Sequence, residues 1–353
     1  MRGLLAFDCL LETNSERRQA RRLSLWASGI MRLLVTGGLG FIGSGFIEWI
    51  LQNNAGVHIT NVDKCDYMAR EYNVAPHPRY LYIRADITDA SRMREIFEEA
   101  QPEIVVHFAA QSCVTRSFDL AFQYTKDNVL GTHVLLETAR CYGRLRKFVH
   151  FSTDEVYGDV GPGVVCDAAA PLNPSNPYSA SKAAAELYVR AYGNAYGVPI
   201  IITRGNNTYG PRQYPEKLIP LFLTQILEGK PCTVHGKGDT RRNFIYVDDV
   251  SRAVATIIDR GQIGKVYNIG TSFEFSVMEI YDKLRAIFAD LGVAPSFQFV
   301  SDPRPFNDSR YAIDSSALRE LGWSEDTPFD DGLRKTVDWY RTHRDYWGEA
   351  HGS

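Results

Sequence analysis

From Met31 onward, short apolar runs alternate with longer segments in which apolar and polar positions recur at helical spacing. The apolar runs predict buried strands, and the first amphipathic segment predicts a helix over Phe41–Leu51. Strands that alternate with helices form a parallel sheet covered by helices on both faces. The strands predicted in this way are Leu33–Val35, His58–Asp63, Tyr80–Arg84, Ile104–His107, Phe148–Ser152 and Ile200–Thr203.

The sequence pattern changes after about Asn206, where prolines become frequent and Gly236 and Gly238 mark a turn. Two further runs, Asn243–Val247 and Val266–Ile269, predict strands that return to the sheet. The remaining segments would form a smaller lobe over the carboxyl edge of the sheet, which is where open α/β sheets bind ligands.

The pattern therefore predicts an α/β fold: a Rossmann-type, doubly wound parallel sheet with a smaller C-terminal α/β substrate lobe. The cofactor-binding domain is predicted over residues 31–205 with the returns near 243–271, and the substrate-binding lobe over residues 206–242 and 272–353. Residues 1–30 lack this pattern and are expected to be a disordered N-terminal extension. Their acidic residues argue against the alternative of a transit peptide.

Composition narrows the functional classes. Hydrophobic residues make up 44% of the chain and charged residues 23%, the balance of an ordinary globular protein. The formal net charge of −3 argues against a nucleic-acid partner, and no apolar run approaches the roughly 20 residues that span a membrane. The six cysteines form neither a metal-binding cluster nor a disulfide framework, so we expect no metal site and a reducing, cytoplasmic location.

Three glycines, Gly37, Gly40 and Gly43, stand between the first predicted strand and the first predicted helix. Such a turn needs a residue that tolerates positive φ, and it allows the backbone to approach a pyrophosphate at the helix N-terminus. The alternative is a glycine-rich turn that only packs closely on its helix. These three positions are candidates for dinucleotide binding.

Asp63 ends an apolar strand twenty positions beyond Gly43. A carboxylate there can accept hydrogen bonds from the adenosine ribose and repel a 2′-phosphate, which favours NAD over NADP. The adjacent Lys64 could soften this discrimination. Asp86 and Ile87 follow the third strand and could hold the adenine, although Asp86 could equally cap a turn or helix.

Tyr178 and Lys182 are four residues apart, so they share one face of a predicted helix. An ammonium close to a phenol favours phenolate, so we expect Lys182 to lower the pKa of Tyr178. The tyrosine could then take a proton from a substrate hydroxyl as hydride leaves for nicotinamide. An ordinary surface helix is the alternative.

Thr153, Asp154 and Glu155 stand at the carboxyl end of a buried strand. Two adjacent acids suit a reaction that needs one acid and one base, provided that their surroundings separate their pKa values. The alternative is a solvated strand end with a helix-capping aspartate.

With these residues in place, the chain from about Met31 to Trp339 resembles the dTDP-glucose 4,6-dehydratases and their animal and plant nucleotide-glucose relatives, within the extended short-chain dehydrogenases/reductases. The Gly-x-x-Gly-x-x-Gly spacing is that of the extended type. Several motifs, among them NPYSASKAAAE, are shared with epimerases and decarboxylases. Two others, Thr-Asp-Glu and Tyr-Pro-Glu-Lys-Leu-Ile-Pro, are much more specific.

The resemblance implies a mechanism. Tyr178, supported by Lys182 and Thr153, would deprotonate the C4 hydroxyl of the sugar while hydride moves to NAD. Glu155 would then remove the C5 proton, and Asp154 would protonate the C6 hydroxyl so that water departs. Hydride would return to C6 and yield a 4-keto-6-deoxy sugar, so that NAD is recycled.

The resemblance also implies two sets of binding residues. The NAD set contains the three glycines, Tyr178 and Lys182, together with Phe41, Ile42, Asp63, Asp86, Ile87, Ala109 and Ala110. The nucleotide-sugar set consists of Ser112, Thr153, Asn207, Lys217, Leu218, His235, Arg242, Asn268, Asp302 and Asn307. Cationic members suit a pyrophosphate.

Several residues depart from the bacterial pattern, including Gln111 where glutamate is usual and Cys113 where histidine is common. These departures leave the choice between dTDP-glucose and UDP-glucose open. The alternative functions are a 4-epimerase or UDP-glucuronate decarboxylase, neither of which needs the acid at Asp154, and a non-catalytic NAD-binding protein. Two predicted helices, Ala121–Tyr142 and Ser179–Tyr196, resemble the family's dimer-forming pair, so a homodimer is expected.

Overall fold

The computed structural model describes residues 29–348 of the 353-residue chain. The N-terminal extension predicted over residues 1–30 therefore lies, apart from its last two residues, outside the described part. Among the described residues, no helix combines the length and the apolar character needed to cross a bilayer.

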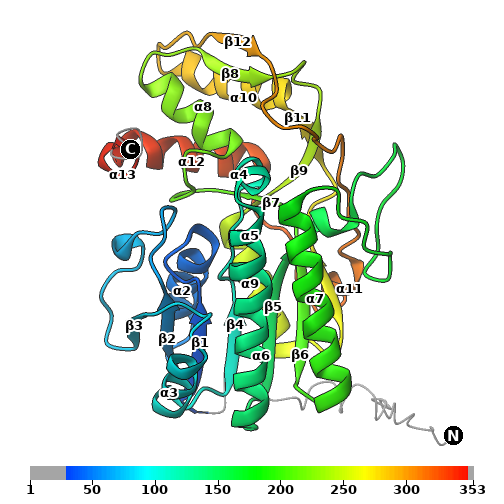
Figure 1. Ribbon diagram of the computed structural model, residues 1–353. Coiled ribbons are helices and arrows are strands. Elements are labelled where there is room, and N and C mark those ends of the chain that lie inside the picture. The colour runs from blue at the N-terminus through cyan, green and yellow to red at the C-terminus, as the bar shows by residue number, and fades with distance from the viewer. Residues whose placement is uncertain (1–28, 349–353) are drawn as a thin grey trace, which may run out of the picture.

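A seven-stranded, wholly parallel sheet forms the centre of the molecule (Figure 1). Its order is β10-β6-β5-β4-β1-β2-β3, so the chain winds outward in both directions from β1 and confirms the predicted Rossmann-type fold. The strands are β1 (Met31–Thr36), β2 (Val57–Asp63), β3 (Tyr80–Arg84), β4 (Ile104–His107), β5 (Lys147–Thr153), β6 (Ile200–Gly205) and β10 (Val266–Ile269).

Helices cover both faces of this sheet, because its apolar residues alternate between two cores. On β1, Leu33 and Val35 pack into one core and Leu34 into the other. The first core contains residues of α2 (Phe41–Asn53) and α9 (Val247–Arg260). The second is formed with α3 (Ala90–Ala100), α6 (Gly131–Tyr142) and α7 (Pro177–Tyr196).

One predicted strand has a different partner from the one expected. The segment predicted as Asn243–Val247 is β9 (Arg241–Tyr246), and it does not return to the main sheet. The edge beside β6 is already occupied by β10, while Phe244 and Tyr246 of β9 pack into the core of the smaller lobe. β9 therefore forms a separate three-stranded sheet with β7 (Asn207–Tyr209) and β11 (Glu274–Ser276).

The smaller lobe lies beyond the carboxyl ends of the main strands (Figure 1). Aromatic and aliphatic side chains from its helices and strands share one core. Its other elements are α8 (Leu218–Leu227), β8 (Cys232–His235), α10 (Val277–Asp290), β12 (Phe297–Val300), α12 (Phe329–Thr342) and α13 (Arg344–Gly348).

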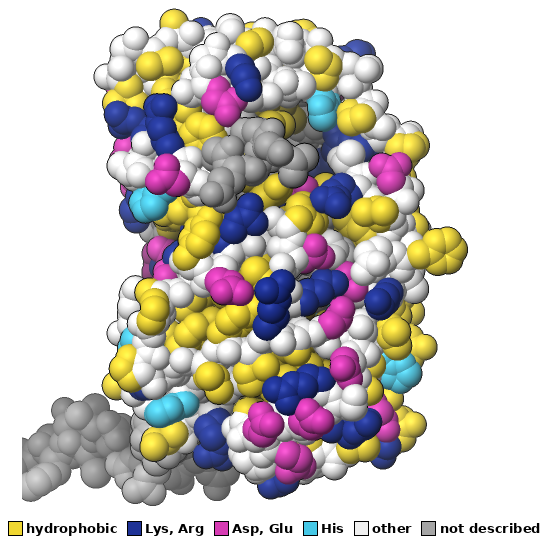
Figure 2. Space-filling view, turned by 60° about the vertical axis from the view of Figure 1, so that its left-hand side comes forward, with side chains coloured by type: hydrophobic (Ala, Val, Ile, Leu, Met, Phe, Trp, Pro, Cys, Tyr) yellow, Lys and Arg dark blue, Asp and Glu magenta, His cyan; other side chains and the backbone are white. Residues whose placement is uncertain are grey.

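Short elements carry several of the side chains that matter below. They are η2 (Glu71–Asn73), α4 (Val114–Asp119), α5 (Ala121–Tyr124), the π-helical turn η3 (Thr125–Leu130), η4 (Asp154–Tyr157) and α11 (Ser316–Arg319). On the face shown in Figure 2, basic and acidic side chains are interspersed, so this face offers no continuous basic surface.

Candidate active site

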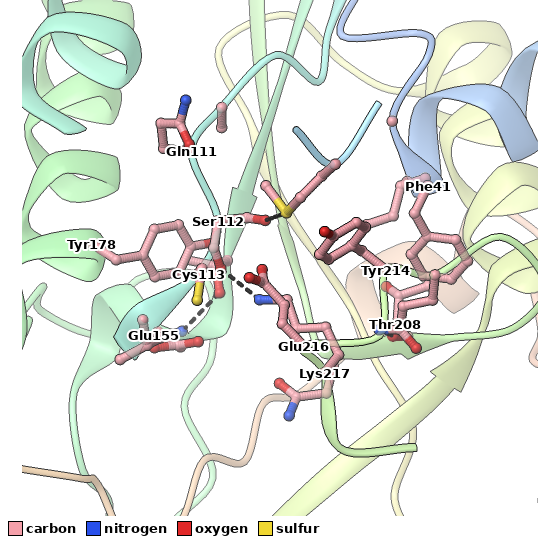
Figure 3. A pocket seen from close by; sticks show the side chains of 18 of the residues that line it. Phe41, Gln111, Ser112, Cys113, Glu155, Tyr178, Thr208, Tyr214, Glu216 and Lys217 are labelled. Atoms are coloured by element: carbon pink, nitrogen blue, oxygen red, sulfur yellow. Dashed lines mark hydrogen bonds between the residues drawn. The ribbon is translucent and has the colours of Figure 1, made fainter. Parts of the chain in front are cut away.

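A cavity of about 480 Å³ lies between the carboxyl ends of the parallel strands and the smaller lobe. In Figure 3, Tyr178 and Glu155 lie on one side of this pocket, and Phe41 and Tyr214 lie on the other. Most of the residues proposed from the sequence line this one space. They are Gly37, Gly40, Phe41, Ile42, Gly43, Asp63, Asp86, Ile87, Ala109, Ala110, Ser112, Thr153, Glu155, Tyr178, Lys182, Asn207, Lys217, Leu218, His235, Arg242 and Asn307.

The three glycines of the first turn serve different needs. Gly37 has φ +73°, and a Cβ there would lie 2.5 Å from the backbone of Ala109. A Cβ on Gly43 would lie 2.3 Å from the carbonyl oxygen of Gly37. Close packing within the protein is therefore enough to require glycine at both of these positions. This agrees with the alternative interpretation, in which the turn only packs closely on its helix.

Gly40 is different, because a Cβ there would meet only the carbonyl oxygen of Gly37, at 3.4 Å. It lines the cavity and is the N-cap of α2, where no side chain of the described residues caps the helix. The N-terminus of α2 is thus open toward the cavity, with no acidic residue in its first turn. This arrangement fits the phosphates of a dinucleotide.

Asp63 and Asp86 stand at the ends of β2 and β3. Both oxygens of Asp63 already accept backbone hydrogen bonds, from Leu39 at 2.9 Å and Cys65 at 2.8 Å, while burial raises its pKa. Asp86 accepts hydrogen bonds from the backbone and the hydroxyl of Thr88, both at 2.9 Å. Asp86 therefore caps a turn and also lines the cavity.

The strand β5 and the helix α7 bring the proposed catalytic residues together. α7 begins at Pro177 behind the capping box of Asn176 and Ser179, which fixes the helix at the site. Tyr178 and Lys182 are 8% and 3% exposed, so the interpretation of α7 as an ordinary surface helix is wrong at these positions. The Lys182 ammonium donates to the carbonyl of Phe151 in β5 at 2.7 Å.

The predicted lowering of the Tyr178 pKa is wrong for the protein by itself. Burial, with the carboxyl groups of Glu155 and Asp154, raises the pKa of Tyr178 well above its usual value. A hydrogen bond with Thr153 acts in the opposite direction but is outweighed. Burial also lowers the pKa of Lys182 to about 8. The groups of the protein itself therefore favour the protonated form of Tyr178.

The two adjacent acids lie in unequal surroundings. Asp154 is 2% exposed and does not line the cavity; its Oδ2 accepts a hydrogen bond from the Asn206 amide at 2.7 Å, and its Oδ1 accepts one from the Thr153 hydroxyl at 3.2 Å. Burial and the charge of Glu155 raise the pKa of Asp154 to about 7.

Glu155 lines the cavity. Its Oε2 accepts hydrogen bonds from the Asn176 amide and the Tyr311 hydroxyl, both at 3.3 Å, and burial raises its pKa. The interpretation of this strand end as solvated is therefore wrong.

Two residues assigned to the nucleotide sugar do not line the cavity. The Asn268 side chain is buried, and it donates to the carbonyls of Cys166 and Asp314 and accepts from Tyr157. Its hydrogen-bonding groups are thus used inside the protein, and the assignment of Asn268 to substrate binding is wrong. The assignment of Asp302 is also corrected, because its carboxylate binds Arg304 at 2.7 and 2.8 Å. Arg304 itself lines the cavity.

The structure also brings in residues that the sequence did not single out. Asn176, Asn206 and Tyr311 contact the two acids. The Tyr67 hydroxyl donates to both oxygens of Glu216, at 3.2 and 3.3 Å. Asn176 and Glu216 lie within the motifs quoted above, which was the only available signal for them, whereas 156 positions separate Tyr311 from Glu155.

Comparison with known proteins agrees with this geometry. The family described as GDP-mannose 4,6 dehydratase matches residues 34–336. The chain is 42% identical to mouse dTDP-D-glucose 4,6-dehydratase, covering 90% of this chain and 91% of that one. A crystal structure of dTDP-glucose 4,6-dehydratase from Streptomyces venezuelae with NAD bound is 40% identical, with a TM-score of 0.85 and coverage of 90% and 99%.

A plant relative extends beyond this chain. The Arabidopsis thaliana trifunctional UDP-glucose 4,6-dehydratase, 3,5-epimerase and reductase is 42% identical over 91% of this chain, which spans only 49% of the plant protein. The family match over most of the described fold, and the close likeness to full-length relatives, show that this chain belongs to the nucleotide-sugar 4,6-dehydratase family of the extended short-chain dehydrogenases/reductases.

Proposed function

We propose that the protein is a hydro-lyase that uses NAD to dehydrate a nucleoside-diphosphate glucose, either dTDP-glucose or UDP-glucose, to the 4-keto-6-deoxy sugar. The observation that carries the proposal is the pair of acids at the end of β5. Asp154 has a pKa of about 7, and Glu155 faces the same cavity as Tyr178 and Lys182. One acid and one base with different surroundings are what elimination of water requires.

Different residues of the chain are placed to contact different parts of NAD. The open N-terminus of α2 would receive the pyrophosphate, Asp63 the adenosine ribose, and Asp86 with Ile87 the adenine. Phe41, Ile42, Ala109 and Ala110 would line the rest of the groove. Oxidised NAD would supply the hydride acceptor and one positive charge close to Tyr178.

Tyr178 takes the proton of the C4 hydroxyl, and Lys182 and Thr153 support it. Glu155 then removes the C5 proton, which the new C4 ketone has made acidic. Asp154 provides the proton for the departing C6 hydroxyl. Because Asp154 lies behind Thr153, the protonated carboxyl would give its proton to the Thr153 oxygen as the Thr153 hydroxyl, which lines the cavity, turns and gives its own proton to the C6 oxygen.

The nucleotide sugar would lie on the side of the smaller lobe. Its pyrophosphate needs cations, and Lys217, Arg242 and Arg304 line the cavity there. Arg242 donates to the side chain of Asn307 at 3.1 Å, which orients both groups. Ser112, Asn207, Leu218 and His235 complete this part of the lining.

Turnover with the two sugar nucleotides tests the proposal. Purified protein is incubated separately with dTDP-glucose and UDP-glucose, and the 4-keto-6-deoxy product is followed by its absorbance in alkali. We expect product from at least one substrate without added NAD, because the cofactor is recycled. Failure with both substrates, in protein that contains NAD, would defeat the proposal.

Three further proposals accompany this function: the domain boundaries, the oligomeric state and the location in the cell. Residues 31–205 would form the cofactor domain together with the return near 243–271, which begins at α9 because β9 belongs to the smaller lobe, and residues 206–242 and 272–353 would form the substrate lobe. The expected homodimer is supported by apolar side chains on neighbouring helices, since Phe122 is 94% exposed and Leu187 60%. Light scattering of the purified protein tests the dimer.

The proposed cytoplasmic location, supported by the thiols of the described cysteines, is tested by cell fractionation.

A further inference from the structure

Asp63 and Lys64 place opposite charges side by side at the end of β2, and both residues line the cavity. A carboxylate in this position favours ribose hydroxyls and repels a 2′-phosphate. A lysine that could reach the same point would attract that phosphate. The two residues by themselves therefore leave the choice between NAD and NADP open.

The Lys64 ammonium is already engaged. Its Nζ donates to Oδ2 of Asp127 at 2.7 Å and lies 3.8 Å from a carboxylate oxygen of Asp66 and also of Asp86. Burial acts to lower the pKa of Lys64, but the hydrogen bond and charge of Asp127 outweigh it, so the pKa is raised. Lys64 thus stays charged and points to Asp127.

Asp127 is positioned rigidly. It lies in the π-helical turn η3, a distortion that often marks functional sites, and is 5% exposed. Its Oδ2 also accepts a hydrogen bond from Gln111 at 2.8 Å, and its Oδ1 accepts one from Gln123 at 2.8 Å. Although burial opposes ionisation, these donors and Lys64 hold the pKa of Asp127 below its usual value.

We propose that Asp127 is a specificity-determining residue, which selects NAD over NADP by holding Lys64 away from a 2′-phosphate. The proposal rests on the proposed function, because it assumes that a dinucleotide binds at Asp63. One ammonium lies among the carboxylates of Asp63, Asp66, Asp86 and Asp127. A 2′-phosphate would therefore bring its charge into a region that is already negative, and the adjacent lysine is held by Asp127.

Competition between the two dinucleotides tests this role. Wild-type protein and variants are equilibrated with an equimolar mixture of NAD and NADP and desalted, and the dinucleotides released by acid are quantified by chromatography. Asp127→Asn keeps the shape of the side chain and removes its charge, which weakens the strongest attraction that holds Lys64. We expect this variant to raise the ratio of NADP to NAD by about tenfold or more.

Lys64→Met provides the matched control. Alone it should leave the ratio within about twofold of wild type, because the lysine does not contact the cofactor phosphate there. Combined with Asp127→Asn, it should abolish the gain in NADP. If Asp127→Asn does not fold, Asp127→Ser removes the same charge with a smaller side chain and carries the same expectation.

The outcomes separate this inference from the proposed function. If the wild type retains NAD but removal of the Asp127 charge leaves the ratio unchanged, or the gain persists in the double variant, this inference alone is overturned. Equal retention of NAD and NADP by the wild type overturns it as well. If the wild type retains neither dinucleotide, the proposed function and this inference fall together.

Discussion

The side-chain amide of Asn206 donates a 2.7 Å hydrogen bond to Oδ2 of Asp154, and both residues are buried at the carboxyl ends of adjacent strands. The other oxygen of the Asp154 carboxyl accepts a hydrogen bond from Thr153, which lines the cavity. Burial and the charge of Glu155 raise its pKa to about 7, so the protonated form persists near neutral pH. A carboxyl group in this state can donate a proton under physiological conditions.

Asp154→Asn should separate the two halves of the reaction. Oxidation at C4 needs Tyr178 and Lys182, which this substitution leaves in place, whereas loss of water needs the proton of Asp154. We expect water loss to slow by about 10²–10⁴-fold while reduced nicotinamide accumulates on the protein. Rapid mixing with the sugar nucleotide, followed by nicotinamide absorbance, measures both steps. Asp119→Asn, at an exposed carboxylate, is the control, and equal loss of both steps would contradict the assigned role.

Asp154 should also give the free energy of unfolding a pH dependence. Its pKa rises from 3.8 to about 7 on folding, so between these values the native state holds a proton that the unfolded chain has released. The stability from this protonation is complete below about pH 4 and is lost as the pH rises to about 7. Asparagine does not ionise, so Asp154→Asn avoids this loss. At about pH 8 the free energy of unfolding of the variant should exceed that of the wild type by on the order of 2 kcal/mol.

Denaturant unfolding of both proteins, at about pH 4 and about pH 8, measures this difference. The difference in unfolding free energy should be much smaller at the lower pH, where the native carboxyl is protonated and the unfolded one, near its own pKa, is protonated in part. A difference that is the same at both pH values would show that folding does not shift the pKa of Asp154.

Gly40→Ala should weaken NAD binding, whereas Gly43→Ala should lower the stability of the protein. A Cβ on Gly40 meets nothing closer than 3.4 Å, so the variant should fold with nearly unchanged Tm but bind NAD at least about tenfold more weakly. A Cβ on Gly43 lies 2.3 Å from a backbone oxygen, so that variant should lower the Tm. Thermal unfolding and quantification of bound NAD distinguish the two. Normal NAD content in Gly40→Ala would exclude close approach of the cofactor at this turn.

Asn268→Ala should reduce stability without changing substrate affinity. The side chain makes three hydrogen bonds inside the protein, and their loss should cost about 2–3 kcal/mol of unfolding free energy. Arg242→Ala is the comparison. Arg242 lines the cavity, so its removal should raise KM for the sugar nucleotide by about tenfold or more. A comparable rise in KM for Asn268→Ala would restore its assignment to substrate binding.

The sequence by itself determined the parallel sheet, the glycine turn and the presence of two adjacent acidic residues at the end of a buried strand. A strand buried on both faces is largely apolar, so β4 and β6 are visible in the chain through their apolar runs Ile104–Val106 and Ile200–Ile202. The same pattern identified β9 as a strand but did not show its sheet, because the partner depends on which edge is still open when β10 has paired with β6.

Only the tertiary structure decided the electrostatics of the site. Asn206 and Asn268 are both buried asparagines, yet one holds an acid beside the cavity and the other bonds inside the protein. Lys64 and Asp127 are separated by 63 positions and become partners at 2.7 Å only when η3 packs beside β2. A pKa and a charge preference depend on burial and on distances of a few ångströms, and folding sets both between residues that are remote along the chain.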